Sequence, residues 1–276
     1  MIRVLGKLSL LWLLLLTSLL SCEESRSLKL TNTANIVNGT SSDFATVSTV
    51  LIKTYYQTSR ELKFTYCSGT LISKQFVLTA AHCVKVDQVQ KIEVSFPFLQ
   101  TSEIVSQQKI TAHPDYAASK LSNNLSDFRD LALVKLSTIP LEPYVSLPLV
   151  TSNQEKFSFL AYGYGEQSGT LLSKATENFE LKKILLQTEN FAKTKTYFLA
   201  DQSRGGVCFG DSGGPAIVQT ANGPSLIGIA VDVLFDPNRM ADPHYDRCLA
   251  NSVFMNVSYF ADWIRETEAK LMSLEN

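Results

Sequence analysis

The sequence has little excess charge and few of the residues that most often carry chemistry. Its 25 lysines and arginines nearly balance its 26 aspartates and glutamates, so the formal net charge is −1. It contains only three histidines and five cysteines, and it has no internal repeat or low-complexity tract. Because a near-neutral chain offers no polycationic surface, we expect no nucleic-acid partner. The remaining composition, 45% hydrophobic and 18% charged, is enough for one large domain or two small ones.

The first 22 residues are typical of a secretory signal peptide. Arg3 and Lys7 precede a leucine-rich core, which is too short and wrongly flanked for a stop-transfer helix. The segment ends in LLSC at Cys22, which resembles a bacterial lipobox, where the cysteine is lipidated and becomes the new N-terminus. The alternative is an ordinary signal peptide cleaved nearby. We expect an exported protein, secreted or periplasmic or at the outer surface, and we favour lipidation of Cys22.

Four cysteines remain after Cys22, namely Cys67, Cys83, Cys208 and Cys248. Four cysteines in an oxidising compartment indicate two disulfides, although their number alone permits three pairings. The segment between Cys22 and Ile36 is polar apart from two leucines, which is typical of a tether or propeptide.

From Ile36 onward, short apolar runs alternate with turn-forming residues. Most runs have the length of a strand, are rich in β-branched or aromatic residues, and are bounded by Gly, Asn, Pro or Ser. This pattern predicts an all-β fold, a sandwich or barrels, and the polar stretch 136–157 is a candidate linker between two halves. The exception is the stretch about 257–273, where apolar residues share one helical face and predict a C-terminal helix: Phe260, Trp263, Ile264 and Leu271.

Three short motifs contain residues that could carry chemistry. His82, in TAAHC, follows a strand-like run, and a histidine can act as a general base near neutral pH, although alone it could equally be a core residue. Asp130 heads the apolar run LALV, where a turn aspartate is the plainer interpretation. Ser212 lies in GDSGGP, whose glycines allow close backbone approach and whose N–H groups could stabilise an oxyanion, although a glycine-rich hairpin turn is the alternative.

Together, these motifs closely resemble the chymotrypsin-like serine protease family, as an exported, bacterial member. The resemblance extends from Ile36 to about Ile264. The segments that carry it are TAAHC at 79–83, DLALVKL at 130–136, GDSGGP at 210–215, IVNG at 36–39, HPDY at 113–116, AYGYG at 161–165 and FADWI at 260–264.

The resemblance implies a Ser-His-Asp mechanism. Ser212 would be the nucleophile, His82 the general base and then acid, and Asp130 the carboxylate that orients His82. The N–H groups of Gly210 and Ser212 would form the oxyanion hole. The substrate would be a protein or peptide, cleaved through an acyl-enzyme without a metal or cofactor, and the enzyme would be a monomer.

The fold implied is two six-stranded antiparallel β-barrels with the active site between them. A protease domain at 36–276 would hold a first barrel at about 36–145, a second at about 146–256 and the C-terminal helix. The resemblance also implies disulfides Cys67–Cys83 and Cys208–Cys248, whereas two other bridges common in the family have no cysteines here.

Activation is also implied by the resemblance. In this family, cleavage frees an amino group that pairs with the aspartate before the nucleophile, and Ile36 and Asp211 match these two positions. The propeptide would then be 23–35. The residue before the cut is Asn35 rather than Lys or Arg, so another protease cuts there, or the enzyme processes itself, or the chain stays an uncut zymogen.

Substrate specificity is predicted from three positions. Gly206, at the expected floor of the primary pocket, carries no charge and disfavours Lys or Arg in that pocket. Val233 would narrow the pocket and Ser252 would form the opposite wall, which predicts small or medium apolar side chains before the scissile bond. Asp232 stands where the family usually has tryptophan. That departure, with Asn35, weakly favours the alternative of a catalytically silent homologue that acts by binding.

Overall fold

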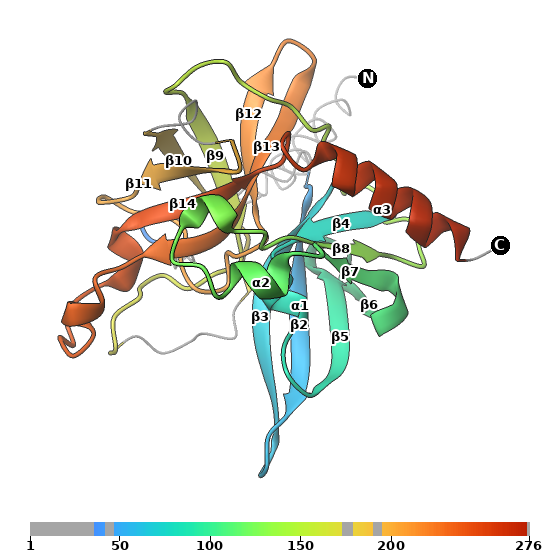
Figure 1. Cartoon of the computed structure of the whole chain (residues 1–276), viewed down its shortest axis with the longest axis horizontal. Coiled ribbons are helices and arrows are strands. Elements are labelled where there is room, and N and C mark those ends of the chain that lie inside the picture. Colours follow the sequence, from blue (N-terminus) through green and yellow to red (C-terminus); the bar gives the residue numbers. More distant parts are fainter. Residues whose placement is uncertain (1–35, 42–46, 173–178, 190–194, 275–276) are drawn as a thin grey trace, which may run out of the picture. The chain divides into compact units, whose positions relative to one another are not determined.

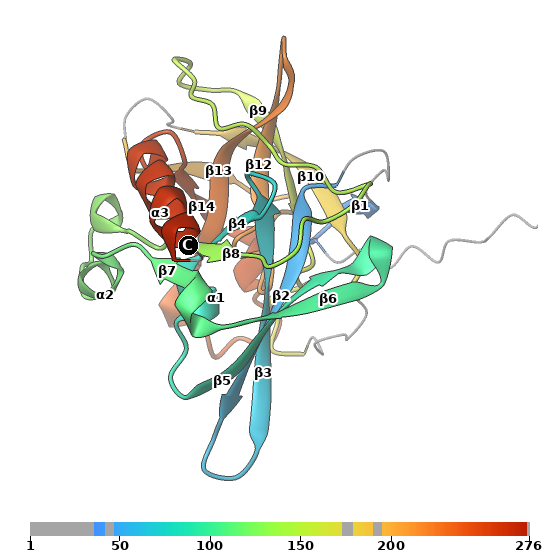
Figure 2. The same cartoon turned by 90° about the vertical axis from the view of Figure 1, so that its right-hand side faces the viewer.

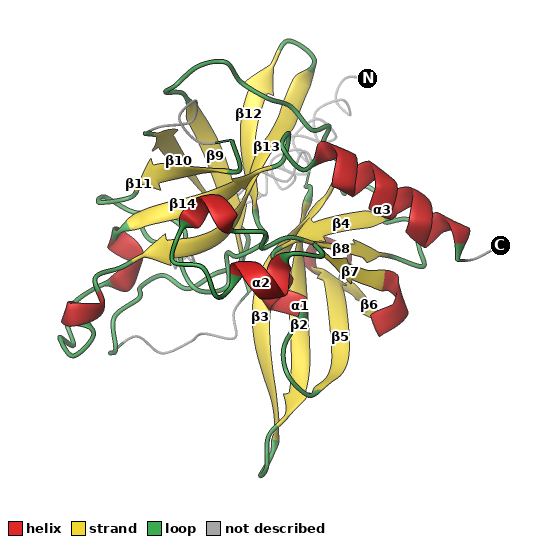
Figure 3. Ribbon diagram, in the orientation of Figure 1, coloured by secondary structure: helices red, strands yellow, loops and turns green. Residues whose placement is uncertain are grey.

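The computed structural model consists mostly of β-strands, with few helices (Figures 1 and 3). It describes residues 36–41, 47–172, 179–189 and 195–274, which belong to one compact unit, Ala34–Asn276. The predicted signal peptide, the lipidation site Cys22 and the tether 23–35 lie outside the described residues. None of the helices in the described residues is long and apolar enough to cross a membrane.

The first sheet contains seven strands in the order β6-β5-β2-β3-β4-β8-β7, and every neighbouring pair is antiparallel. In β5, Ile92, Val94 and Phe96 are buried while the residues between them are more exposed, which is the two-residue period of a strand with one face on the core. The hairpin of β2 and β3 extends beyond the other strands (Figure 2). The strands are β2 (Thr49–Gln57), β3 (Leu62–Leu71), β4 (Phe76–Thr79), β5 (Val89–Phe96), β6 (Thr101–Val105), β7 (Ile110–Ala112) and β8 (Ala132–Lys135).

The second sheet closes on itself. Its strands follow the order β10-β11-β14-β13-β12-β9, and β9 pairs with β10 again, which makes a closed six-stranded barrel; a short seventh strand, β1, pairs with β10 from outside. Aromatic rings fill part of this barrel, with Phe198 stacked on Phe254 at a centroid distance of 5.2 Å. The strands are β1 (Thr40–Ser41), β9 (Ser158–Gly163), β10 (Lys182–Thr188), β11 (Tyr197–Asp201), β12 (Pro215–Thr220), β13 (Gly223–Leu234) and β14 (Asn251–Asn256).

In the part of the chain that the structure describes, three α-helices connect or cover the strands. The predicted C-terminal helix is present as α3 (Ala261–Ser273), which lies beside β8 of the first sheet (Figures 1 and 2). Its buried residues Ile264, Thr267 and Leu271 recur at helical spacing and face the core. The other two are single turns, α1 (Ala81–Val84) and α2 (Tyr116–Ser119). Short 3₁₀ turns lie at Pro97–Leu99, Gln107–Lys109, Leu125–Asp127, Pro237–Arg239 and Arg247–Leu249.

The stretch 136–157 contains no named strand and connects the two sheets. Its backbone is tied to both of them, since the amide of Leu147 donates to Leu71 on β3 and the amide of Val150 donates to Leu226 on β13. This double attachment holds the two halves in one unit.

The all-β class with a closed barrel and a C-terminal helix is confirmed, but the first half is not a closed six-stranded barrel. Within the described residues β6 pairs with β5 and β7 pairs with β8, but β6 and β7, which are consecutive segments separated by the 3₁₀ turn Gln107–Lys109, do not pair with each other. The first half is therefore an open seven-stranded sheet. The N-terminal strand β1, which the sequence groups with the first half, pairs with the second sheet.

Candidate active site

His82 lies on α1, a single helical turn that begins directly after β4. Ala80 and Ala81 before it are fully buried, which seats the turn against the core. A disulfide between Cys67 on β3 and Cys83 holds the other side of the turn, with Cα atoms 6.0 Å apart. The backbone around His82 is thus fixed, while its side chain remains 39% exposed.

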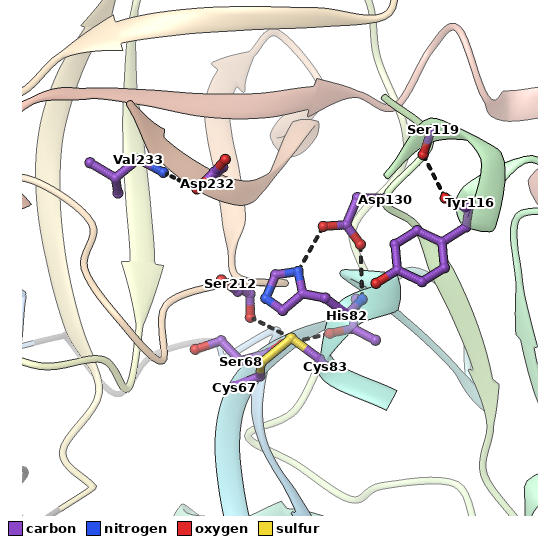
Figure 4. Close-up of polar contacts among 11 residues, drawn as sticks. Cys67, Ser68, His82, Cys83, Tyr116, Ser119, Asp130, Ser212, Asp232 and Val233 are labelled. Atoms are coloured by element: carbon purple, nitrogen blue, oxygen red, sulfur yellow. Dashed lines mark hydrogen bonds and ion pairs between the residues drawn. A yellow bond between two sulfur atoms is a disulfide. The ribbon is translucent and has the colours of Figure 1, made fainter. Parts of the chain in front are cut away.

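Asp130 reaches His82 because β4 and β8 pair, with Thr79 opposite Ala132. The Asp130 carboxylate accepts from His82 twice, through Nδ1 at 2.7 Å and through the backbone amide at 2.9 Å (Figure 4). Both oxygens are therefore engaged by one residue, which fixes the ring plane. With Asp130 accepting the Nδ1 proton, Nε2 of the neutral ring is left as the acceptor.

The charge state of His82 depends on this carboxylate. Burial lowers the pKa of His82, but the negative charge of Asp130 and its hydrogen bond outweigh burial, so the pKa is raised above its ordinary value. Asp232 raises it further and Lys120 opposes them. Asp130 thus stabilises the imidazolium that a general base becomes.

Ser212 stands on the other side of the ring from Asp130 (Figure 4). Its backbone carbonyl accepts from Ser68 of the first sheet at 2.8 Å, while the next residue, Gly213, donates to Ala230 of β13 at 2.7 Å. The serine is thereby held between the two sheets. In the described residues, Ser212 Oγ makes no hydrogen bond to the ring, and such contacts are often long without substrate.

Two glycines next to Ser212 are required by the shape of the loop. Gly210 has φ +95° and Gly213 has φ +84°, in the left-handed region that glycine tolerates best. A Cβ on Gly210 would lie 2.3 Å from Tyr66, and one on Gly213 would lie 2.1 Å from the Ser68 carbonyl oxygen. Among the described residues, neither the Gly210 amide nor the Ser212 amide donates a hydrogen bond. Both amides could therefore donate to an acceptor that binds in the cleft.

Asp211 takes no part in the His82–Asp130 contact and is fully buried behind the loop. Its carboxylate accepts from the amides of Gly165 at 2.7 Å and Cys208 at 2.8 Å. Burial raises the pKa of Asp211 to about 8, and these hydrogen bonds offset burial only in part. A buried carboxyl of this kind gains stability from a nearby cation.

Ile36 is also fully buried. The residue after it, Val37, exchanges two backbone hydrogen bonds with Gly206, at 3.2 and 3.1 Å. Val37 also packs with Cys208 and Cys248, which form the second disulfide with Cα atoms 5.1 Å apart. The start of the domain is therefore held against the loop that leads to Asp211.

The side chains of His82 and Ser212 open into one cavity of about 310 Å³. Its walls are largely apolar and come from α1, α2, the connection before β8, the loop that contains Ser212, and β13 of the second sheet. Beyond His82, Asp130 and Ser212, the lining residues that bear on the chemistry are Tyr116, Lys120, Val207, Phe209, Asp232 and Val233.

Of the three predicted specificity residues, only Val233 lines this cavity. Ser252 pairs with Val233 from β14 and is fully buried behind it. Gly206 is closed off by Gln202, whose Oε1 would lie 2.0 Å from a Cβ at that position. Gln202 itself is buried and hydrogen-bonded to the backbone of Val207, so it cannot easily withdraw.

Several residues that line the cavity were not among the site residues predicted from the sequence. Tyr116 belongs to HPDY and Phe209 lies inside the glycine-rich stretch, so both could have been inferred from their neighbours. Lys120 and Phe128 lie on the connection between β7 and β8, where only folding brings them to the cleft.

His82 lies close to the sulfurs of Cys67 and Cys83, a grouping that could suggest a metal site. The two sulfurs are joined at 2.05 Å, so neither is a thiolate available to a metal ion. The cluster therefore belongs to the disulfide. The two bridges join the pairs of cysteines that the family resemblance implies.

Comparison with known proteins agrees with this architecture. The family profile named Trypsin matches residues 37–264. The chain is 27% identical over 236 residues to the CLIP domain-containing serine protease B4 of Anopheles gambiae, covering 73% of this chain and 61% of that protein. It is 32% identical over 179 residues to a trypsin of Xenopus laevis, covering 59% of this chain and 69% of that protein. The chain belongs to the trypsin family of chymotrypsin-like serine proteases.

A trypsin-3 of Salmo salar is 31% identical over 175 residues, covering 59% of this chain and 71% of that protein. The chain thus spans about three fifths to seven tenths of these relatives. All of them come from animals, and they give no support to the bacterial source that the lipobox indicates.

Proposed function

We propose that the protein is a serine endopeptidase in which Ser212 is the nucleophile, His82 the base and Asp130 the orienting carboxylate. One observation carries the proposal: Asp130 holds the His82 ring through Nδ1 at 2.7 Å, with Ser212 on the far side of the ring in a shared cavity. Membership of the trypsin family supports it.

The reaction would proceed in two halves. Ser212 Oγ attacks the peptide carbonyl while Nε2 of His82 takes its proton, and the oxyanion is met by the amides of Gly210 and Ser212. The imidazolium then protonates the leaving amine, and an acyl-enzyme remains. Water, deprotonated by His82, hydrolyses the ester and restores Ser212.

A fluorophosphonate probe tests this proposal, because it reacts only with an activated serine. Protein that begins at Ile36 should be labelled at one site, and Ser212→Ala should remove the label. Ser203→Ala is the control, since Ser203 is exposed outside the cavity and its loss should leave labelling complete. A folded wild-type protein that never labels would instead support a catalytically silent homologue that acts by binding.

We also propose that the enzyme is made as a zymogen and that cleavage before Ile36 activates it. The new amino group would pair with Asp211, whose buried carboxyl has no cationic partner in the described residues. The docking of Val37 on Gly206 supports this route, because it holds the chain near the cut against the Asp211 loop. Asn35 requires an activator without a preference for Lys or Arg, or self-processing.

Export is supported by the two disulfides, which persist in oxidising compartments. If Cys22 is lipidated, a cut between Asn35 and Ile36 would release the domain from its anchor, so activation and release would be one event. N-terminal sequencing of the active enzyme tests this, and active enzyme that still carries residues 23–35 would contradict it.

In the primary pocket we propose a preference for small or medium apolar side chains. Val233 and Val207 line the cavity, and no acidic group can be placed at Gly206. A peptide-library cleavage profile tests this. A strong preference for Lys or Arg directly before the scissile bond would refute it.

A further inference from the structure

Asp232 is a charged residue in the cavity to which the proposed catalytic roles assign no task. It lies on β13, whose residues 232–234 pair with β14 along one edge, Val233 opposite Ser252. Along the other edge, β12 pairs with β13 only as far as Ile229, and Ala230 bonds to Gly214. Beyond Ala230, no strand pairs with this second edge among the described residues, although the Val233 amide donates to Asp232 Oδ1 and the Val233 carbonyl accepts from the Phe235 amide.

β13 has a bulge at Val231, between Ala230 and Asp232, and from Val231 onward buried and exposed side chains alternate. Val231 and Val233 are buried, whereas Asp232 between them is exposed, on the opposite face. All three line the cavity that contains His82. In Figure 4, Asp232 lies above the His82 ring and Ser212.

The carboxylate of Asp232 is anchored but not neutralised. One oxygen, Oδ1, accepts from the amide of Val233 at 2.8 Å, and Asp232 makes no salt bridge within the described residues. Burial raises the pKa of Asp232, the Val233 hydrogen bond and the positive charge of His82 oppose that, and Asp130 adds repulsion.

The other charged groups that line the cavity contact residues other than Asp232. Asp130 is committed to His82. Lys120 has its Nζ over the ring of Tyr116, 5.5 Å from the centroid. The second carboxylate oxygen of Asp232 therefore faces a largely apolar cleft without a cationic partner. A positively charged side chain of the substrate can donate a charge-assisted hydrogen bond to it.

We propose that Asp232 is a specificity-determining residue that binds a lysine or arginine side chain of the substrate, carried by the second residue before the scissile bond. The inference rests on the proposed protease function and adds a subsite to it. The enzyme would then prefer a basic residue at this subsite and an apolar residue in the primary pocket.

The position follows from strand geometry. An extended peptide that adds to the free edge of β13 presents alternate side chains to opposite faces. If the residue before the scissile bond enters the pocket beside Val207 and Val233, the preceding residue points to the opposite face, where Asp232 lies. Its ammonium or guanidinium group would meet the free oxygen of Asp232.

The experiment compares two peptides that differ only at the second residue before the scissile bond, lysine against methionine, with valine before the bond. The concentration of active sites in enzyme that begins at Ile36 is first measured by fluorophosphonate titration, which does not depend on the peptide. In wild type, kcat/KM should favour lysine about twofold to fivefold at low salt, and the preference should shrink as salt is added.

Asp232→Asn should abolish the lysine preference while fluorophosphonate titration still counts active enzyme. Asp262→Asn removes the same charge from the exposed start of α3 and should retain the preference. A lysine preference that survives in Asp232→Asn, or its absence in wild type that cleaves both peptides, would overturn the proposal. The proposal about Asp232 is also overturned if the enzyme reacts with the fluorophosphonate but cleaves neither peptide. If the enzyme does not react with the fluorophosphonate at all, the result contradicts the protease function instead.

Discussion

At the scale of single residues, the behaviour of His82 depends on Asp130. The carboxylate accepts from both Nδ1 and the backbone amide of His82, so it determines the ring orientation and the tautomer together. It also raises the pKa of His82 against the effect of burial. Because a general base must be neutral, activity should rise as pH rises through this raised pKa.

Asp130→Asn should therefore change both rate and pH dependence. The amide removes the negative charge and can donate to Nδ1, which favours the wrong tautomer, so kcat/KM should fall by about 10³–10⁴-fold. With burial no longer opposed, the pKa of His82 should fall, and the acid limb of the residual activity should move to lower pH. Histidine NMR titration and pH–rate profiles measure the two effects.

The control for this variant is Asp115→Asn, which alters an exposed carboxylate beside a different histidine, His113. It should leave kcat/KM unchanged. An Asp130→Asn protein with the wild-type acid limb would show that another group sets the pH dependence.

At the scale of elements, α3 is attached to the first half by packing and by polar contacts, among them a buried one from Lys135 and one between Ser73 and Glu268 at 2.8 Å. Ile264 and Leu271 are almost fully buried. The buried Lys135 on β8 donates from Nζ to the Leu271 carbonyl at 3.1 Å, near the C-terminal end of the helix, where a positive charge is favourable. The helix thus covers β8, the strand that follows Asp130.

Leu271→Ala should lower the free energy of unfolding by about 2–5 kcal/mol, because it deletes buried methyl groups and leaves a cavity. Met272→Ala, one residue further on and 46% exposed, should change it by no more than about 0.5 kcal/mol. Urea unfolding of the two variants measures the difference. Equal losses would mean that α3 does not dock through the Leu271 face.

At the scale of the whole molecule, the proposed activation makes folding stability depend on Asp211. In the uncut chain its carboxyl is buried and its pKa is raised to about 8, well above that of an unfolded aspartate. Between about pH 4 and pH 8 the folded state therefore binds more protons than the unfolded state, and stability falls as pH rises.

The uncut protein should accordingly lose stability between pH 5 and pH 8, and Asp211→Asn should lose less over that range. Protein beginning at Ile36 should lose less as well, because its amino group would pair with the ionised carboxylate. Urea midpoints at the two pH values test all three proteins. An uncut wild-type protein that gains stability from pH 5 to pH 8 would contradict the link.

The sequence alone was enough to name the family, the strand-rich class, the C-terminal helix and the candidates His82, Asp130 and Ser212. Each of these depends on a short stretch whose local chemistry is distinctive, such as the glycines that positive φ requires beside Ser212. The disulfide pairs also followed from the resemblance, since four cysteines in matching contexts carry that information.

Only the tertiary structure decided what depends on long-range pairing and packing. β6 and β7 do not pair with each other in the first sheet, Gln202 closes the space beside Gly206, and β14 places Ser252 behind Val233. Asp232 was visible in the sequence only as a departure from a motif. Its place in the same cavity as His82 arises because β13 brings the second sheet to a histidine held by the first, a proximity that no local pattern encodes.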